Sequence, residues 1–189
     1  MIAKLFQRLL RRPAPRQLFM DDIVTDGIEI LPASRREWAA REMKTIAAGT
    51  SPGEPDWTDL HVRRPDKDAR TIADLAIHFA EAALVLAELL APFDAVVTGD
   101  PNQPTLAQTA RGFGPSPLSA VAIYEDRQTR TVSWIEVSLR GSDADNLAVL
   151  SAIARLPTRE PLVVVNWNRG RIAEMAELAA LERFTSPKA

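Results

Sequence analysis

Polar side chains that could hold a ligand gather at two junctions in the C-terminal third of the chain. One junction follows the strand predicted over residues 131–139, and the other follows the strand predicted over residues 161–167. In open α/β sheets, ligands bind beyond the carboxyl ends of parallel strands, where helix N-termini offer free amide donors. We therefore expect a candidate binding edge formed by Asp143, Asp145, Asn166, Asn168, Arg169 and Arg171, with Trp57 from the polar stretch 50–68 as a further candidate.

The same side chains also suit ordinary turns, because Asn and Asp cap helices and reverse the chain. Gly170 would then serve only to permit an unusual backbone angle. A flat surface at this edge would favour a protein that only binds a partner, whereas a deep pocket would favour an enzyme. The residues that such an enzyme would use are Asp143, Asp145, Asn168 and Arg169.

A second set of chemically capable residues falls in residues 71–91, a stretch with helical periodicity. The set consists of Asp74, His78, Glu81 and Glu88, which lie roughly along one helical face. Carboxylates and a histidine at this spacing could bind a metal ion or transfer a proton. The rest of the stretch is apolar, so the set also fits its one solvated stripe. No other segment offers matching ligands, and we predict no metal site, no cofactor and no catalytic residue.

Composition narrows the chemistry further. The chain has 189 residues and no cysteine, which removes disulfides, thiolate nucleophiles and cysteine-ligated metals. Residues 1–16 carry five basic residues and no acid, so the remaining chain holds 18 basic against 25 acidic residues, a net charge of −7. An acidic body does not suit nucleic acid, because nonspecific binding depends on neutralising phosphates. We expect a cytoplasmic protein that binds no nucleic acid.

Residues 2–12 form a short basic amphipathic segment. One helical face would carry its apolar side chains, which are Ile2, Leu5, Phe6, Leu9 and Leu10, and the opposite face would carry Lys4, Arg8, Arg11 and Arg12. Such a segment is typical of a helix that touches a membrane surface or docks on a partner. It also fits a terminal helix that packs on its own domain. We expect residues 1–16 to be this segment and its linker, followed by one globular domain over 17–189.

The domain is predicted to have an α+β (or α/β) fold, with a mixed sheet of about four or five strands covered by helices. Val163, Val164 and Val165 form a continuous run that is typical of a strand buried on both faces. The C-terminal part is predicted as a β-β-α-β-α unit. Its elements are a hairpin of residues 118–125 and 131–139, a helix over 143–156, a strand over 161–167 and a helix over 171–184.

Four predictions concern the preceding part of the chain. Residues 23–31 are predicted to form a strand or hairpin, and residues 36–48 a helix. Residues 71–91 are apolar around most of a helical circumference, which favours a largely buried central helix. Prolines mark 101–117 as irregular, and GFGPSP at 112–117 lacks the lysine and the Ser/Thr ending of a phosphate-binding loop.

The absence of a coherent catalytic set favours a non-enzymatic binding or regulatory protein. We expect it to engage a protein partner through an acidic surface, as accessory, chaperone-like or toxin-neutralising proteins do, because such a surface steers a basic partner. The alternative is an enzyme whose polar site lies at the junctions 141–145 and 166–171. A weak membrane contact through residues 2–12 is compatible with either function, and the oligomeric state stays open.

Overall fold

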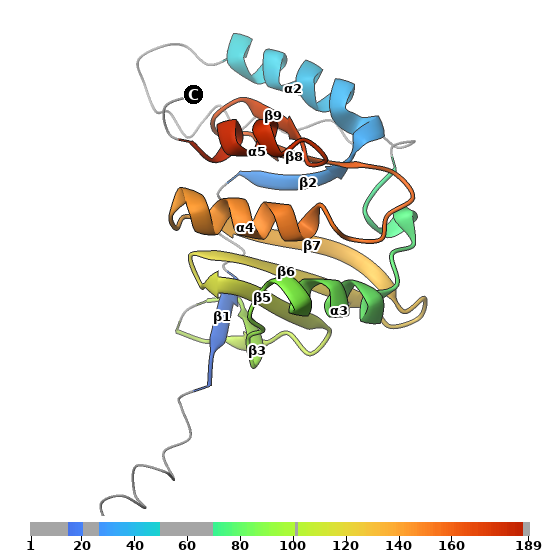
Figure 1. The fold of residues 1–189 in the computed structure, drawn as a ribbon, viewed down its shortest axis with the longest axis vertical. Coiled ribbons are helices and arrows are strands. Elements are labelled where there is room, and N and C mark those ends of the chain that lie inside the picture. Colours follow the sequence, from blue (N-terminus) through green and yellow to red (C-terminus); the bar gives the residue numbers. More distant parts are fainter. Residues whose placement is uncertain (1–14, 21–26, 50–69, 101, 187–189) are drawn as a thin grey trace, which may run out of the picture.

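The computed structural model describes residues 15–20, 27–49, 70–100 and 102–186. Residues 2–12, Trp57 and residues 23–26 of the predicted strand or hairpin lie outside these ranges. The chain forms β1 (Gln17–Met20), β2 (Ile28–Pro32), η1 (Ala33–Arg35), α2 (Arg36–Gly49), η2 (Ala73–Leu75), α3 (Phe79–Leu89), β3 (Ala95–Thr98), β4 (Thr105–Leu106), β5 (Ala110–Ser116), β6 (Ser119–Asp126), β7 (Thr131–Leu139), α4 (Asp143–Ile153), β8 (Leu162–Asn166), β9 (Arg171–Glu174) and α5 (Leu178–Thr185) (Figure 1).

The strands form three sheets of three strands each, with the orders β5-β6-β7, β2-β8-β9 and β1-β3-β4. The α+β class and the β6–β7 hairpin are confirmed, but the predicted single sheet of four or five strands is wrong. β8 pairs with β2 on one edge and β9 on the other, both antiparallel, so it has no free edge for a parallel partner. β2 lies between β8 and β7 without joining the ladder of β7 (Figure 1).

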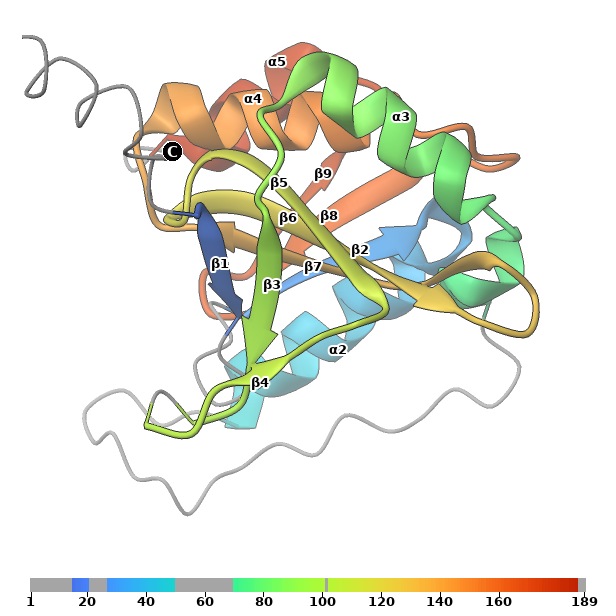
Figure 2. The same cartoon turned by 90° about the horizontal axis from the view of Figure 1, so that it is seen from below.

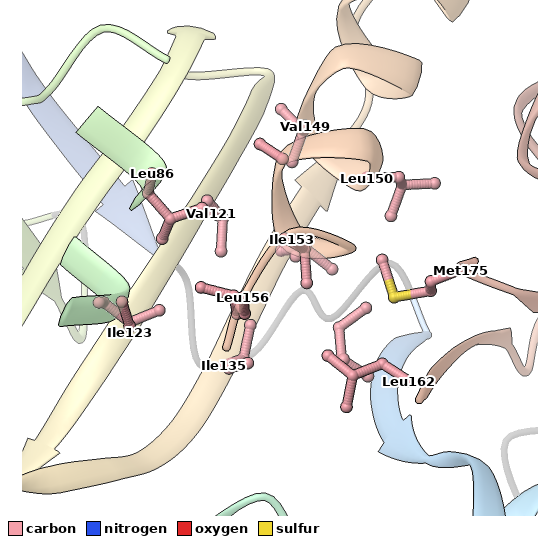
Figure 3. Packing of buried hydrophobic residues seen from close by; sticks show 14 of the residues in the cluster. Leu86, Val121, Ile123, Ile135, Val149, Leu150, Ile153, Leu156, Leu162 and Met175 are labelled. Carbon is pink, nitrogen blue, oxygen red and sulfur yellow. The ribbon is translucent and has the colours of Figure 1, made fainter. Parts of the chain in front are cut away.

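Helices α3, α4 and α5 cover one side of the strands (Figure 2). The main core lies beneath them as one cluster, whose members include Leu86, Val121, Ile153 and Met175 (Figure 3). On the opposite side, α2 covers β8, where Val163 packs in a separate cluster, and β1 and β3 cover β5 and β6. The valine run of β8 is therefore buried on both faces, as its sequence predicts.

The helix predicted over 71–91 is wrong in its first third. The chain makes a short 3-10 turn, reverses at Ala76 with a φ of 50°, and begins α3 only at Phe79. The cause is tertiary. The Val132 backbone N–H donates to Ile77 O at 2.8 Å, and the Phe79 N–H donates to Arg130 O at 3.0 Å, so this segment pairs with β7 instead of continuing a helix. Leu84, 67% exposed, shows that α3 is not buried all round.

Two further predictions need correction. Residues 171–184 do not form one helix, because Arg171–Glu174 is a strand paired with β8 and only Leu178–Thr185 is helical. Gly170, with a φ of 60°, completes the tight four-residue turn that makes this hairpin. Residues 110–116 form strand β5 rather than an irregular segment, and its ladder with β6 is interrupted between Phe113 and Ser116, where Pro115 cannot donate a hydrogen bond.

Candidate functional site

A pocket of about 430 Å³ lies where the end of β7 and the start of α4 meet the end of β8 and the end of α5. Four residues of the predicted candidate edge, Asp143, Asn166, Asn168 and Arg169, lie in its lining. The residues that line the pocket are Ile28, Leu139, Arg140, Gly141, Asp143, Asn146, Asn166, Asn168, Arg169, Phe184 and Thr185.

The floor of the pocket is fixed by Asn146, which is only 5% exposed. Its side-chain amide donates to Leu139 O and to Gly141 O, each at 3.2 Å, and its Oδ1 accepts from the hydroxyl of the fully buried Ser119 at 2.7 Å. Gly141 lies so close to Ser119 Oγ that a Cβ at this position would clash with it. One side chain thus ties β6, the end of β7 and the first turn of α4 into one unit.

Several polar groups at the edge are committed to the fold. The Asp145 N–H donates to Ser142 Oγ at 3.1 Å, which caps α4. Asn166 Oδ1 accepts from the Arg169 N–H at 2.9 Å and closes the β8–β9 turn. The Arg171 guanidinium donates to Ser186 O at 2.8 Å and to Phe184 O at 3.4 Å, which anchors the end of α5 behind the pocket. These three groups do what turn and cap chemistry requires.

Three other polar side chains remain available to a ligand. Within the described part of the chain, the carboxylate of Asp143, the amide of Asn168 and the guanidinium of Arg169 have no hydrogen-bond or ion-pair partner, and all three line the pocket. Asn168 sits on Gly27, where a Cβ would come within 2.7 Å of its side chain. The pocket therefore offers a negative, a neutral and a positive group to one ligand.

The pocket carries little that could perform chemistry. Its lining contains one carboxylate, Asp143, and one hydroxyl, Thr185, and no histidine. Asp143 is exposed, so water reaches its carboxylate. Nucleophilic catalysis needs a nucleophile activated by an adjacent base, and the lining supplies no such pair. Among the described residues, the lining therefore offers a ligand charged and hydrogen-bonding groups.

The structure brings four of the sequence-predicted residues to the pocket, which are Asp143, Asn166, Asn168 and Arg169. Asp145 and Arg171 lie outside its lining, and Trp57 is not among the described residues. Sequence reasoning missed Arg140 and Asn146. Arg140 could have been included from the sequence, because it directly precedes Gly141 at the same junction. Asn146 is a polar residue in an otherwise apolar helical stripe, and this pattern indicates a buried side chain with a hydrogen-bond partner.

The second candidate set does not assemble. The break at Ala76 separates Asp74 from α3, and His78 is the extended N-cap residue of that helix, so the four residues do not share a helix. Hydrogen bonds from Thr71, whose N–H and hydroxyl donate to Asp74 Oδ2 at 2.7 and 2.8 Å, hold the pKa of Asp74 below its ordinary value. The described ranges contain no cluster of three potential metal ligands, and none of their helices is long and apolar enough to cross a bilayer.

Trp167 and Trp38 form an aromatic pair on the α2 side of the β2-β8-β9 sheet. Their rings meet edge to face, with centroids 5.8 Å apart, and the Trp167 indole N–H donates to Glu29 Oε2 at 2.9 Å. These two tryptophans are therefore partly buried packing residues, and Trp134 on β7 is half exposed.

Comparison of the chain with family models, curated proteins and solved structures finds no match.

Proposed function

We propose that this is a non-enzymatic binding protein that holds a polar segment of a partner protein in the pocket between α4 and the β8–β9 turn. The observation that carries the proposal is a set of three polar side chains, Asp143, Asn168 and Arg169, that have no partner among the described residues and surround one preformed pocket. A volume of about 430 Å³ is in the range of specific ligand sites. The neighbouring Asn146 fixes the floor, so little ordering is needed on binding.

The charges suggest how such a partner is recognised. Arg169 favours an acidic side chain, Asp143 favours a basic one, and Asn168 can pair with a peptide group, which together fit a polar loop better than an apolar one. The acidic body, with a net charge of −7 over residues 17–189, adds long-range attraction for a basic protein. The pocket would then provide local contacts, and the acidic surface would raise the rate of encounter.

An enzyme remains the second candidate, and the pocket itself is the observation that favours it, since a flat surface would have favoured binding alone. Its site would use Asp143 with Arg169. The chemistry available to one exposed carboxylate and one guanidinium is narrow, because the described lining supplies no histidine and no second carboxylate to share a proton transfer with Asp143.

The test is a pull-down from native lysate with the tagged full-length chain, a salt series and mass spectrometry. Two variants make it specific: Arg169→Ala removes a pocket cation, and Arg155→Ala removes an exposed cation at the other end of α4. We expect a stoichiometric, salt-sensitive partner that Arg155→Ala retains and Arg169→Ala loses. A partner that both variants retain equally would exclude the pocket. If no partner is captured and a metabolite raises the melting temperature only when Asp143 and Arg169 are intact, the enzyme replaces this proposal.

A further inference from the structure

A second cavity, of about 710 Å³, lies between α3 and the strands β3 and β5. Both α3 and β3 contact β5, which Figure 2 shows beneath α3. Its floor is aromatic, with Phe79, Phe93 and Phe113, each less than a tenth exposed. This is a groove separate from the polar pocket, because the two share no lining residue.

The wall that α3 presents to this groove consists mainly of small residues. Ala80, Ala83 and Ala87 line it, together with Leu84, whose side chain is 67% exposed. Alanines let a second helix approach closely, and an exposed leucine among them offers an apolar side chain for it to bury. α3 has 11 residues and is therefore about 16 Å long, which sets the length of a helix that could lie along it.

The N-terminal part of the chain enters the domain at the rim of this groove. The Arg16 guanidinium donates to Pro92 O at 3.1 Å and to Gly114 O at 2.9 Å, and it stacks 4.5 Å from the centre of the Phe93 ring. The Arg16 N–H donates to Asp94 Oδ2 at 2.6 Å. Pro92, Phe93 and Asp94 all line the groove, so whatever precedes Arg16 starts next to it.

Residues 2–12 match the groove in length and in chemistry. As a helix this 11-residue segment would also be about 16 Å long. The four residue steps between Arg12 and Arg16 span about 12 Å when extended, which lets the segment fold back onto α3. Its apolar face complements the alanines and Leu84. The groove lining balances Asp94 and Glu125 against Arg111 and Arg130. The exposed Glu81 and Glu88 on α3 add negative charge beside it, which favours a basic segment.

We propose that residues 2–12 form an amphipathic helix that packs along α3 in the groove of the same chain. This goes beyond the proposed partner binding, because it gives the basic segment an intramolecular site in an acidic domain. The docked helix hides the same apolar face that would otherwise contact a membrane.

The lack of cysteine makes a direct test possible in the full-length chain. Ala3→Cys, beside the apolar face of the segment, is paired with Leu84→Cys in the groove or with Leu178→Cys on α5, a similarly exposed leucine at 58%. A short bismaleimide is added to dilute protein. We expect crosslinked monomer to form several-fold faster with Leu84→Cys, and we expect Leu5→Asp, which places a charge on the apolar face, to remove that advantage.

The Leu5→Asp variant distinguishes a docked segment from one that is only held nearby by its linker, because the linker brings the segment close to the groove rim whether or not it binds. Limited trypsin cleavage after Arg8 and Arg11 gives a second readout without crosslinker, and it should be several-fold slower in the cysteine-free chain than in Leu5→Asp. Equal crosslinking at positions 84 and 178, crosslinks found only in dimers, or cleavage rates unaffected by Leu5→Asp would each overturn the proposal.

Discussion

Replacing Asn146 by alanine tests the physical basis of the polar pocket. The side chain makes three hydrogen bonds in a buried place, to the Ser119 hydroxyl and to the carbonyls of Leu139 and Gly141. Alanine leaves all three groups without their partner. Ser119 is fully buried, so its hydroxyl cannot turn to bulk water instead.

The expected loss follows from these contacts. A buried hydrogen bond contributes about 1 kcal/mol net, so three bonds give about 3 kcal/mol, and the better helix propensity of alanine returns about 0.5 kcal/mol. We expect Asn146→Ala to lower the free energy of unfolding by about 2–3 kcal/mol. For a chain of this size, 1 kcal/mol corresponds to roughly 2–4 °C, so the melting temperature should fall by about 4–12 °C.

The assay is urea and thermal unfolding followed by circular dichroism, with Asn168→Ala as the matched control. Asn168 is exposed and its side chain has no hydrogen bond within the described part of the chain, so Asn168→Ala should change the free energy of unfolding by no more than about 0.5 kcal/mol. A double variant with Ser119→Ala should be destabilised by about 1 kcal/mol less than the sum of the single variants, because the two side chains share a bond. A loss below about 1 kcal/mol for Asn146→Ala would refute the argument that this residue holds the floor of the pocket.

Two further predictions concern other parts of the fold. Gly27→Ala and Gly170→Ala should each lower the free energy of unfolding by about 1–2 kcal/mol, because both positions have φ near 60°. Gly27→Ala should lower the melting temperature more, because its Cβ also meets Asn168, and equal losses of stability would contradict this contact. Burial acts to raise the pKa of Glu160, but hydrogen bonds from Ser34 and the ion pair with Arg70 together outweigh it, so the pKa lies below the ordinary 4.5. The Glu160 carboxylate therefore stabilises the fold fully above pH 4.5, and this stabilisation is lost as the pH falls through the lowered pKa. The difference in free energy of unfolding between the wild type and Glu160→Gln should close on acidification, and a difference independent of pH would contradict this assignment.

Local sequence patterns determined the elements whose contacts are close along the chain. The β6–β7 hairpin, the capped helix α4 and the doubly buried strand β8 follow from alternation, helical spacing and a continuous valine run, which are properties of a few adjacent residues. The junction residues of the candidate edge were identified in the same way, from their place after strands. Four of them line one pocket.

Tertiary structure alone decided the features that depend on distant partners. Ile77 stays outside the helix and α3 begins only at Phe79, because the backbone groups of these two residues pair with residues 130–132, and this contact outweighs a strong helical pattern. Residues 171–174 form a strand because β8 offers an open edge across a glycine turn, and no local signal specifies such an edge. The same holds for Asn146, since only the fold brings Ser119 to it: a buried polar group is determined by the partner that satisfies it.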